Sequence, residues 1–512
     1  MSRSRRFVSG LALLYGYQAL LVVTGIWLTP FFLKHIGQHS YGLWLVGTQL
    51  LTYLTLTDFG VVALLPLETA YATGRGGGAE NAVDLPLIVG RTMRLVLYQL
   101  PIVVAVAVAM WLTIPAAWQD LQRPLAIVLF GFVLAFPIRI LPALLHGLQD
   151  LAFANSMQIL NWVLSTAVTV WMVLAGWSLV ALAVGWLVSQ TVLAPVYLYR
   201  LWTRFPGVLP RRLPPFEWRT TRTQLGKGFW INVAQVAQLL MSNTDMLIIG
   251  RLLGPAAVVP YACTGKLASV LANQAQILMQ TATPGLCELK SGESRQKLFQ
   301  VLIALNHGIL MFSGLVFCVV LLVNQWFVNW WVTGKQYGGF LLTAAILLNI
   351  LVRHWNTTAG YSVFCFGYQR RISLTNLSDG LVTAAASVGL ITWLGPVGAP
   401  LGSVLGACMV SLPCNLRVIA RDTGVTVLHL VKAMVSAWSW RFAIVAGAVW
   451  WVGVRWSPRN LPEAVIAVAS ITILYGLIML PNVFRSPLGM YIRPLLSSFR
   501  VKYAALQMRF SS

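Results

Sequence analysis

The run from Leu298 to Val323 reads LFQVLIALNHGILMFSGLVFCVVLLV and contains no Lys, Arg, Asp or Glu. A helix needs about 20 mostly apolar residues to cross the hydrocarbon core of a bilayer, so this run predicts a membrane-spanning helix. Similar runs recur along the chain and predict an all-α polytopic membrane protein with about fourteen transmembrane helices. The predicted spans are 8–33, 41–67, 95–114, 124–148, 155–175, 178–199, 228–250, 257–283, 298–323, 339–364, 373–394, 398–418, 438–454 and 463–483.

The composition of the whole chain also indicates an integral membrane protein. Of its 512 residues, 58% are apolar and only 10% are charged, whereas soluble domains are about 25% charged. The net charge of +23 follows the predicted topology, because the segments assigned to the cytoplasm hold 26 Lys and Arg and the outer loops hold six. By the positive-inside rule we expect both termini in the cytoplasm. The basic balance therefore predicts no nucleic-acid partner.

The sequence argues against a metal site and a nucleotide site. None of the six cysteines forms a C-x-x-C pair, so single buried thiols are the expected state. The phosphate-binding pattern G-x-x-x-x-G-K is missing from the sequence. We therefore expect no cofactor, and transport that draws on an ion gradient, the membrane potential or the substrate gradient. Coupling to H+ or Na+ stays open at this point.

A short motif repeats in the two parts of the chain. Leu33-Lys34-His35-Ile36-Gly37 ends the first predicted span, and Gly250-Arg251-Leu252-Leu253-Gly254 ends the seventh, so that cation and glycine keep an offset of 217 residues. Internal repeats are typical of secondary transporters, whose substrate sites usually lie between the repeats. Six spans separate the two motifs, which predicts halves of the same orientation.

The motifs that open each half resemble a known family. They are Ile36-Gly37-Gln38-His39-Ser40-Tyr41-Gly42-Leu43-Trp44, Leu56-Thr57-Asp58-Phe59-Gly60 and Asn243-Thr244-Asp245-Met246-Leu247-Ile248-Ile249-Gly250-Arg251-Leu252-Leu253-Gly254. They resemble the polysaccharide-transporter (Wzx-like) branch of the multidrug/oligosaccharidyl-lipid/polysaccharide exporter superfamily, over roughly residues 8–420. One departure is Pro255-Ala256-Ala257, where the family usually has an acidic residue.

This resemblance implies a fold of two pseudo-symmetric six-helix lobes around a central cavity, plus a C-terminal helix pair that guides a polyprenyl tail. The expected parts are an N-terminal lobe at 1–199, a basic cytoplasmic linker at 200–227, a C-terminal lobe at 228–420, the additional helix pair at 421–483 and a basic cytoplasmic tail at 484–512.

The resemblance also implies a transporter rather than an enzyme. Its expected substrate is an undecaprenyl-diphosphate-linked oligosaccharide, flipped across the bacterial inner membrane by alternating access for lipopolysaccharide or exopolysaccharide synthesis. Membrane lipid, a polysaccharide polymerase and a chain-length regulator are the further partners that it suggests.

Ionisable residues inside the predicted spans are the candidate functional groups, because burying a charge in a bilayer costs about 2.5–3.5 kcal/mol on insertion scales. The cations Arg139, Lys266 and Arg353, with the neighbouring His354, are candidates to bind a diphosphate. The acids are Asp58, Asp245 and Asp379. They are candidates for ion coupling or for ion pairs with the cations, and a pair that opens when an anion arrives would combine both roles.

Polar residues at helical spacing accompany these charges and predict a water-filled cavity, because lipid cannot satisfy their hydrogen bonds. The residues expected to line it are Gln235, Gln238, Ser242, Ser269, Asn273, Gln276 and Asn349. The alternative is that they form hydrogen bonds between helices.

Two other functions remain open at this point. A cation-coupled multidrug antiporter of the same superfamily would need a cavity dominated by acids, whereas the charges within these spans are mainly basic. A membrane polysaccharide polymerase or glycosyltransferase would need a large outer loop, and the longest predicted one is about 15 residues, at 324–338.

Overall fold

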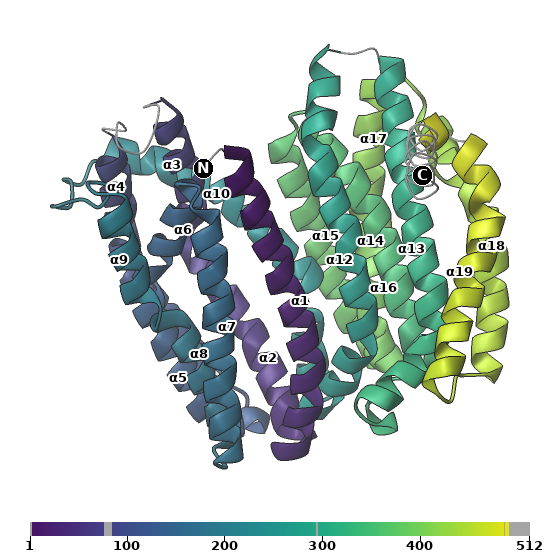
Figure 1. Cartoon of the computed structure of the whole chain (residues 1–512), viewed down its shortest axis with the longest axis horizontal. Coiled ribbons are helices and arrows are strands. Elements are labelled where there is room, and N and C mark those ends of the chain that lie inside the picture. Colours follow the sequence, from purple (N-terminus) through teal and green to yellow (C-terminus); the bar gives the residue numbers. More distant parts are fainter. Residues whose placement is uncertain (1–2, 76–83, 293–294, 486, 491–512) are drawn as a thin grey trace, which may run out of the picture. The chain divides into compact units, whose positions relative to one another are not determined.

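The computed structural model describes residues 3–75, 84–292, 295–485 and 487–490, and within them the regular structure is entirely helical (Figure 1). The chain forms two compact units, Met1–Val259 and Pro260–Ser512. The tail expected at 484–512 lies mostly outside the described residues. The lobe limits and the central cavity expected from the sequence stay predictions.

The first unit consists of helices of very different lengths, many of which pack on helices distant in the sequence. They are α1 (Arg3–His35), α2 (Gln38–Leu54), α3 (Val61–Arg75), α4 (Leu85–Leu112), α5 (Gln119–Ala135), α6 (Ile140–Gly147), α7 (Leu151–Leu174), α8 (Ser178–Thr191), α9 (Ala194–Arg204), α10 (Trp218–Ser242) and α11 (Asp245–Leu252). Helices α10 and α11 pack on α3 and α2 within this unit.

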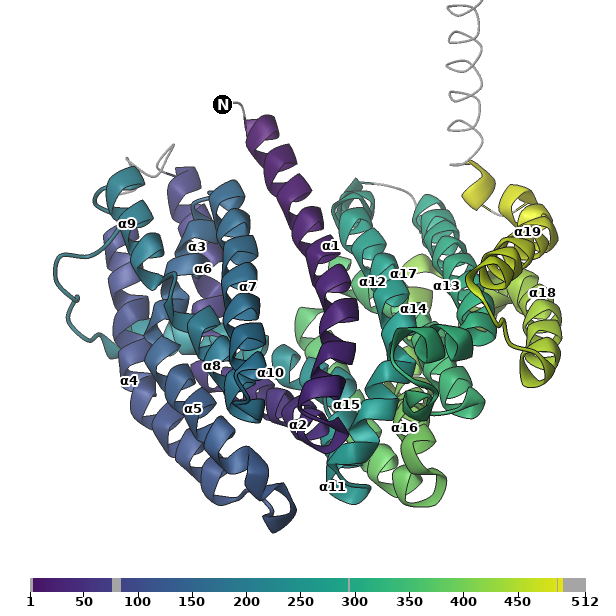
Figure 2. The same cartoon turned by 60° about the horizontal axis from the view of Figure 1, so that its bottom comes forward.

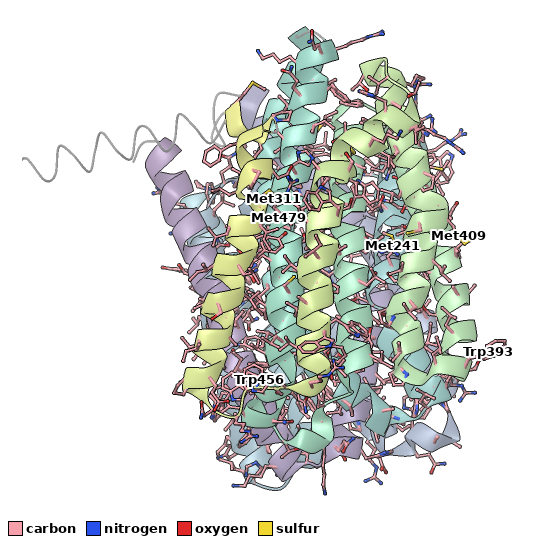
Figure 3. The ribbon with its side chains drawn as sticks, turned by 90° about the vertical axis from the view of Figure 1, so that its right-hand side faces the viewer. Met241, Met311, Trp393, Met409, Trp456 and Met479 are labelled. Atoms are coloured by element: carbon pink, nitrogen blue, oxygen red, sulfur yellow. The ribbon has the colours of Figure 1, made fainter. Side chains whose placement is uncertain are left out.

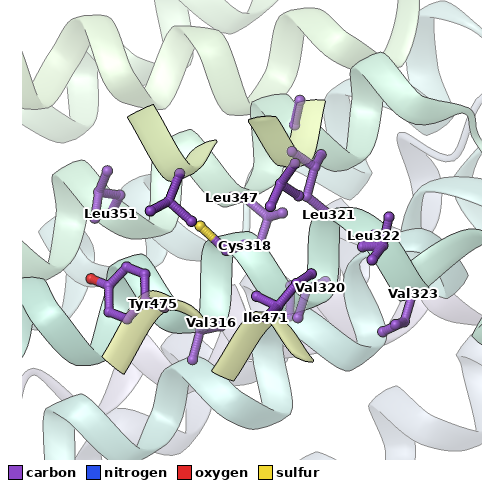
Figure 4. Packing of buried hydrophobic residues seen from close by; sticks show 14 of the residues in the cluster. Val316, Cys318, Val320, Leu321, Leu322, Val323, Leu347, Leu351, Ile471 and Tyr475 are labelled. Carbon is purple, nitrogen blue, oxygen red and sulfur yellow. The ribbon is translucent and has the colours of Figure 1, made fainter. Parts of the chain in front are cut away.

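The second unit is built around α13, which contacts α14, α17, α18 and α19. Its helices are α12 (Pro255–Gly292, whose first turn belongs to the first unit), α13 (Arg295–Trp331), α14 (Phe340–Cys365), α15 (Gln369–Leu394), α16 (Gly398–Gly406), α17 (Leu412–Thr423), α18 (Val427–Arg455) and α19 (Leu461–Arg485). Apolar side chains of α13, α14 and α19 form its core, among them Cys318, Leu347, Ile471 and Tyr475 (Figure 4).

The protein is a multi-pass membrane protein. Among the described residues, nine helices are long and apolar enough to cross a bilayer, and up to eleven when each of two bent pairs counts as one span. One of the nine, Gln369–Thr423, runs through α15, α16 and α17. It folds back on itself, because Ser387 of α15 donates a hydrogen bond to the Ala399 carbonyl of α16 and Asp379 of α15 meets Ser411 beyond α16. Helices α10 and α12, predicted as spans, are helical but are not among the nine.

The glycine of the repeated motif has a positive φ in both places. Gly37 follows α1 with φ of 81° and Gly254 follows α11 with φ of 90°. Glycine has no Cβ, so it takes this left-handed conformation without the steric cost that other residues meet. Each glycine ends one helix and lets the next begin within a residue. The sequence repeat therefore has a structural counterpart.

The surface of the second unit is apolar in the way that lipid contact requires. Trp393 and Met409 point outward, with 88% and 69% of their surface exposed, whereas Met479 is buried in the core beside Met311 (Figure 3). The C-terminal pair α18 and α19 packs on α13, where Gly314 leaves room for the Tyr475 hydroxyl. Helix α18 begins at Val427, eleven residues before the predicted span at 438, because its first turns are helical but more polar.

Candidate functional site

The side chains of Arg353 and Asp379 form a two-pronged ion pair between α14 and α15. Arg353 Nη1 lies 2.6 Å from Asp379 Oδ2, and Nη2 lies 3.0 Å from Oδ1. The remaining guanidinium donors are also used: Nε donates to Ser403 Oγ (3.0 Å), and Nη2 donates to Thr383 Oγ1 and to the Ser403 carbonyl (both 2.9 Å). The Asp379 side chain is fully buried and that of Arg353 is 17% exposed. The planar guanidinium fork is thus saturated by one carboxylate and its neighbours.

A chain of hydrogen bonds extends this ion pair towards α17. Ser411 Oγ donates to Asp379 Oδ2 (2.5 Å), Asn356 Nδ2 donates to Ser411 Oγ (2.8 Å), and Asn415 Nδ2 donates to Asn356 Oδ1 (3.0 Å). These groups are buried, so each bond replaces one that water would otherwise provide. The network connects α14, α15 and the α16–α17 arm into one rigid junction.

Three glycines allow this junction to form. Gly398, Gly402 and Gly406 follow one another at intervals of four residues and place one smooth face of α16 against α15. A Cβ on Gly406 would collide with Thr383 Oγ1 and lie 2.6 Å from Asp379 Oδ1. Directly after Gly406, a π-helical turn at Ala407–Ser411 places Ser411 on the carboxylate. The close approach of two helices therefore positions the acceptors around Arg353.

The second ion pair, in the first unit, joins Arg139 to Asp58. Arg139 Nη2 lies 3.2 Å from Asp58 Oδ2, and Nη1 is buried without a hydrogen-bond partner. The guanidinium also stands over the rings of Phe132 and Phe136, at 5.8 and 5.7 Å from their centroids. The Asp58 side chain is only 3% exposed but that of Arg139 is 28% exposed. This pair is made by a single hydrogen bond and remains partly open.

Asp58 belongs to a break between α2 and α3, where the helical hydrogen bonds are interrupted. Asp58 Oδ1 accepts a hydrogen bond from the Gly60 backbone N–H (2.8 Å). Asn232 of α10 donates to the Leu56 carbonyl (2.6 Å), and Gln99 of α4 donates to the Asp58 carbonyl (3.1 Å). Backbone groups freed by a break inside a bilayer need such partners, because lipid offers none. Four elements of the first unit therefore meet at this break.

Lys266 differs from the two arginines. It is half-buried on α12, and no acid forms an ion pair with it among the residues that the structure describes. Ser269 and Asn273, one and two turns further along α12, are exposed. The side chain of Gln276 lies outside those that the structure describes. Asn349 on α14 has a buried Oδ1 with no hydrogen-bond partner.

The other predicted residues have distinct surroundings. His354 Nδ1 is 2.6 Å from Ser313 Oγ, which ties α14 to α13. On α10, Gln235 is half-buried while Gln238 and Ser242 are exposed and bonded to each other at 2.9 Å. Asp245 is the first residue of α11, just after the break at Asn243 that separates α11 from α10. The structure thus pairs two of the cations with two of the acids and presents polar faces on α10 and α12.

Several residues of these sites were not predicted from the sequence. They are Gln99, Ser403 and Ser411. Their residue types are common in membrane helices, so no composition signal marks them. The spacing of Gly398, Gly402 and Gly406 is a signal that would have found Ser403, because it predicts a close helix contact at that face.

Comparison with solved structures defines the class of this fold. The structure of the lipid II flippase MurJ in an inward closed conformation is similar, with a TM-score of 0.58, 9% sequence identity and coverage of 87% of this chain and 98% of that chain. An inward-facing multidrug resistance MATE family transporter of the MOP superfamily is also similar, with a TM-score of 0.54, 14% identity and coverage of 81% and 96%. The chain therefore shares the fold of these two solved structures.

The sequence then places the chain within a family. A family model described as polysaccharide biosynthesis protein matches residues 92–348, half of the chain. The protein belongs to this polysaccharide biosynthesis protein family. A search of curated proteins gave no match.

Proposed function

We propose that the protein is a flippase for undecaprenyl-diphosphate-linked oligosaccharides, which it moves across the bacterial inner membrane by alternating access. The family and the transporter fold support a polysaccharide-related membrane transporter. The diphosphate would bind protein cations, while the polyprenyl tail stays in lipid and the sugars follow the headgroup. The released repeat unit would then enter lipopolysaccharide or exopolysaccharide synthesis, where a polymerase and a chain-length regulator are its expected partners.

The observation that carries this proposal is the unpaired cation on a polar helix face. Lys266 shares α12 with the exposed residues Ser269 and Asn273 and has no acidic partner among the described residues. The sequence predicts α12 as a span, and polar side chains exposed on such a helix are costly unless they face water or a polar ligand. An ammonium in that position attracts an anion as a point charge. Lys266 is therefore the first candidate for the diphosphate.

The two arginines have different roles in this proposal. Arg353 is held by Asp379, Thr383 and Ser403, so we assign it to the structure of the junction. Arg139 keeps one buried Nη1 without a partner and is partly exposed, so it remains a candidate for the headgroup. His354, bonded to Ser313, would support the fold near Arg353.

Ion coupling, if the transporter uses H+ or Na+, would depend on the acids. Asp379 already neutralises Arg353, and a cation would have to displace that guanidinium to bind there. Asp245 begins α11 at a helix break, and breaks of this kind commonly hold ions in transporters. We therefore propose Asp245 as the coupling acid.

The orientation is part of the same proposal. Both termini and the segment 200–227 would lie in the cytoplasm, because the Lys and Arg content is so much higher in the segments assigned to that side. Reporter fusions at residue 215 and at both termini test this arrangement, and an outside position for residue 215 would overturn it.

The function is tested by reconstituting the full chain in proteoliposomes with a fluorescent undecaprenyl-diphosphate-linked oligosaccharide. Flipping is measured as the fraction of headgroup that becomes protected from a membrane-impermeant quencher. Lys266→Ala should slow flipping about tenfold or more, because a charged hydrogen bond to the phosphate is lost. Lys335→Ala is the matched control, since Lys335 is exposed outside the helices α13 and α14. A wild-type chain that leaves the headgroup in place would refute the proposal.

A further inference from the structure

Two bent helix pairs of the first unit break beside each other. Helix α2 with its short continuation Thr55–Asp58 meets α3 at an angle of 54°, and α5 meets the 3-10 turn Pro137–Arg139 and α6 at 50°. Asp58 is the last residue before the first break, and Arg139 is the last residue of the 3-10 turn at the second. Their ion pair therefore bridges the two breaks.

The segments on the same side of the two breaks pack on each other as a block, and the continuous helix α4 contacts both α3 and α5. Helix α2 packs on α5, where a Cβ on Gly47 would lie 3.1 Å from Leu121. Helix α3 packs on α6, where a Cβ on Gly147 would lie 2.6 Å from Thr69 and 2.9 Å from the Pro66 carbonyl. Figure 2 shows α3 and α6 next to each other, apart from α2 and α5. Each block would move as one body, and the two breaks are the joints between them.

The backbone at the first joint is held in an unfavourable conformation. Phe59 has φ of 48° and Gly60 has φ of 73°. A residue other than glycine in the left-handed region persists only when its surroundings hold it there. The second joint contains Pro137, which removes a helical hydrogen bond at the bend. Neither joint depends on α-helical bonding across the break.

The ion pair at these joints is suited to exchange. One hydrogen bond joins Arg139 to Asp58, and Arg139 Nη1 is buried with no acceptor. The described chain has two ion pairs inside predicted spans. In the other pair, all three nitrogens of Arg353 donate hydrogen bonds, so the guanidinium of Arg139 has fewer of its donors in use. An incoming phosphate offers more acceptor oxygens than Asp58 gives to Arg139 and can bind a guanidinium with two hydrogen bonds.

We infer that the Asp58–Arg139 pair is a latch on a double hinge, and that a phosphate group bound by Arg139 in place of Asp58 releases it. The α3–α6 block then changes its angle to the α2–α5 block. This inference rests on the proposed function for the identity of the phosphate, which belongs to the lipid-linked diphosphate. The latch itself depends only on the geometry of the two breaks.

The test measures the angle between the blocks in the full chain in lipid nanodiscs. Spin labels replace the exposed residues Tyr71 on α3 and Phe130 on α5 in a chain whose six cysteines are replaced by Ala, and the label-to-label distance is measured by pulsed EPR. Asp58→Asn removes the charge but keeps the size of the side chain. It should raise about fivefold the fraction of molecules whose label-to-label distance differs from the main wild-type distance, because a partly exposed ion pair is lost.

A matched control uses another ion pair of the same unit. Asp150 and Arg200 are joined at 2.9 Å, and neither residue belongs to one of the two breaks. Asp150→Asn should leave the distance distribution unchanged. The exchanged pair Asp58→Arg with Arg139→Asp should return the distribution towards that of the wild type, which separates the latch from a folding defect. An unchanged distribution in Asp58→Asn overturns the latch.

The phosphate source is tested in the same nanodiscs. Undecaprenyl diphosphate should bring the wild-type chain to the distances of Asp58→Asn, and undecaprenol, which has no phosphate, should not. Inorganic pyrophosphate distinguishes a free phosphate from a lipid headgroup. If pyrophosphate shifts the distances and undecaprenyl diphosphate does not, the phosphate that releases the latch does not come from a lipid. No response to any phosphate overturns the release step. A chain that fails to flip the oligosaccharide refutes the proposed function but leaves the result for Asp58→Asn intact.

Discussion

Among the described residues, each of the two units holds one arginine–aspartate pair inside predicted spans, yet the two pairs are built in opposite ways. Arg353 and Asp379 lie on unbroken stretches of α14 and α15, and hydroxyl groups of neighbouring residues complete their hydrogen bonds. Arg139 and Asp58 lie at helix breaks and share one hydrogen bond. Saturation and close packing make the first pair a structural junction. The open, singly bonded pair retains the capacity to change partner.

The largest effect should come from cutting the saturated pair. Asp379→Ala leaves the Arg353 guanidinium buried without its carboxylate, and breaking a buried pair on one side costs about 3–5 kcal/mol. We expect a large fall in the unfolding temperature of the purified protein. The double variant Arg353→Met with Asp379→Leu should be clearly more stable than Asp379→Ala, because no unpaired charge is left. Equal losses in both variants would remove the distinction between the pairs.

The helix contact that builds the junction should be the next most sensitive feature. Gly406→Ala places a methyl group against Thr383 and Asp379, and overpacking of this kind costs about 1–3 kcal/mol. Gly447→Ala in α18 is the control, since a Cβ there meets no atom within 4 Å. Thermal unfolding of both variants measures the difference. Similar stability of the two would show that the contact is loose.

A smaller loss is expected at the break in the first unit. Asn232→Ala removes the donor to the Leu56 carbonyl, which costs about 1 kcal/mol for one hydrogen bond. Gln238→Ala, on the same helix, removes only a bond to Ser242 on an exposed face and should be nearly neutral. The unfolding temperatures of the two variants give the comparison. An equal effect would mean that another group satisfies the Leu56 carbonyl at the break.

The smallest effect on stability should come from the cation that belongs to neither pair. Lys266→Met keeps a long unbranched side chain and removes a charge with no acidic partner in the described chain, so we expect a change below about 0.5 kcal/mol. Binding of undecaprenyl diphosphate, measured by native mass spectrometry, should nevertheless weaken about tenfold. Strong destabilisation with intact binding would make Lys266 a structural residue.

The sequence drew attention to the charged residues because charges are rare in apolar runs. Arg139, Asp58, Arg353 and Asp379 were identified in this way, and both ion pairs were among the alternatives considered. Which acid meets which cation was not predictable, since Asp58 and Arg139 are 81 residues apart and their contact depends on tertiary packing. The breaks were also missed: 41–67 and 124–148 were predicted as single spans, although each is bent.

The helical class and the repeat were predictable from local rules. Apolar length predicts spanning helices, and the paired glycines Gly37 and Gly254 end helices as their positions suggested. Helix α18 begins at Val427, before the predicted span at 438–454, because Thr426 caps it and its first turns pack on α13 and α17. Local composition thus predicts the elements better than their ends.

The π-helical turn at Ala407–Ser411 changes the direction in which the side chains after it point. Such a turn inserts about one extra residue into an α-helix, and one residue is about 100° of rotation around the helix axis. Every side chain of α17 therefore faces a direction that a regular helix from Gly398 would not give it. Deleting one residue within 407–411 should turn Asn415 away from Asn356 and expose the opposite face of α17. Among relatives, single-residue gaps in this region should accompany the loss of Ser411 or Asn415.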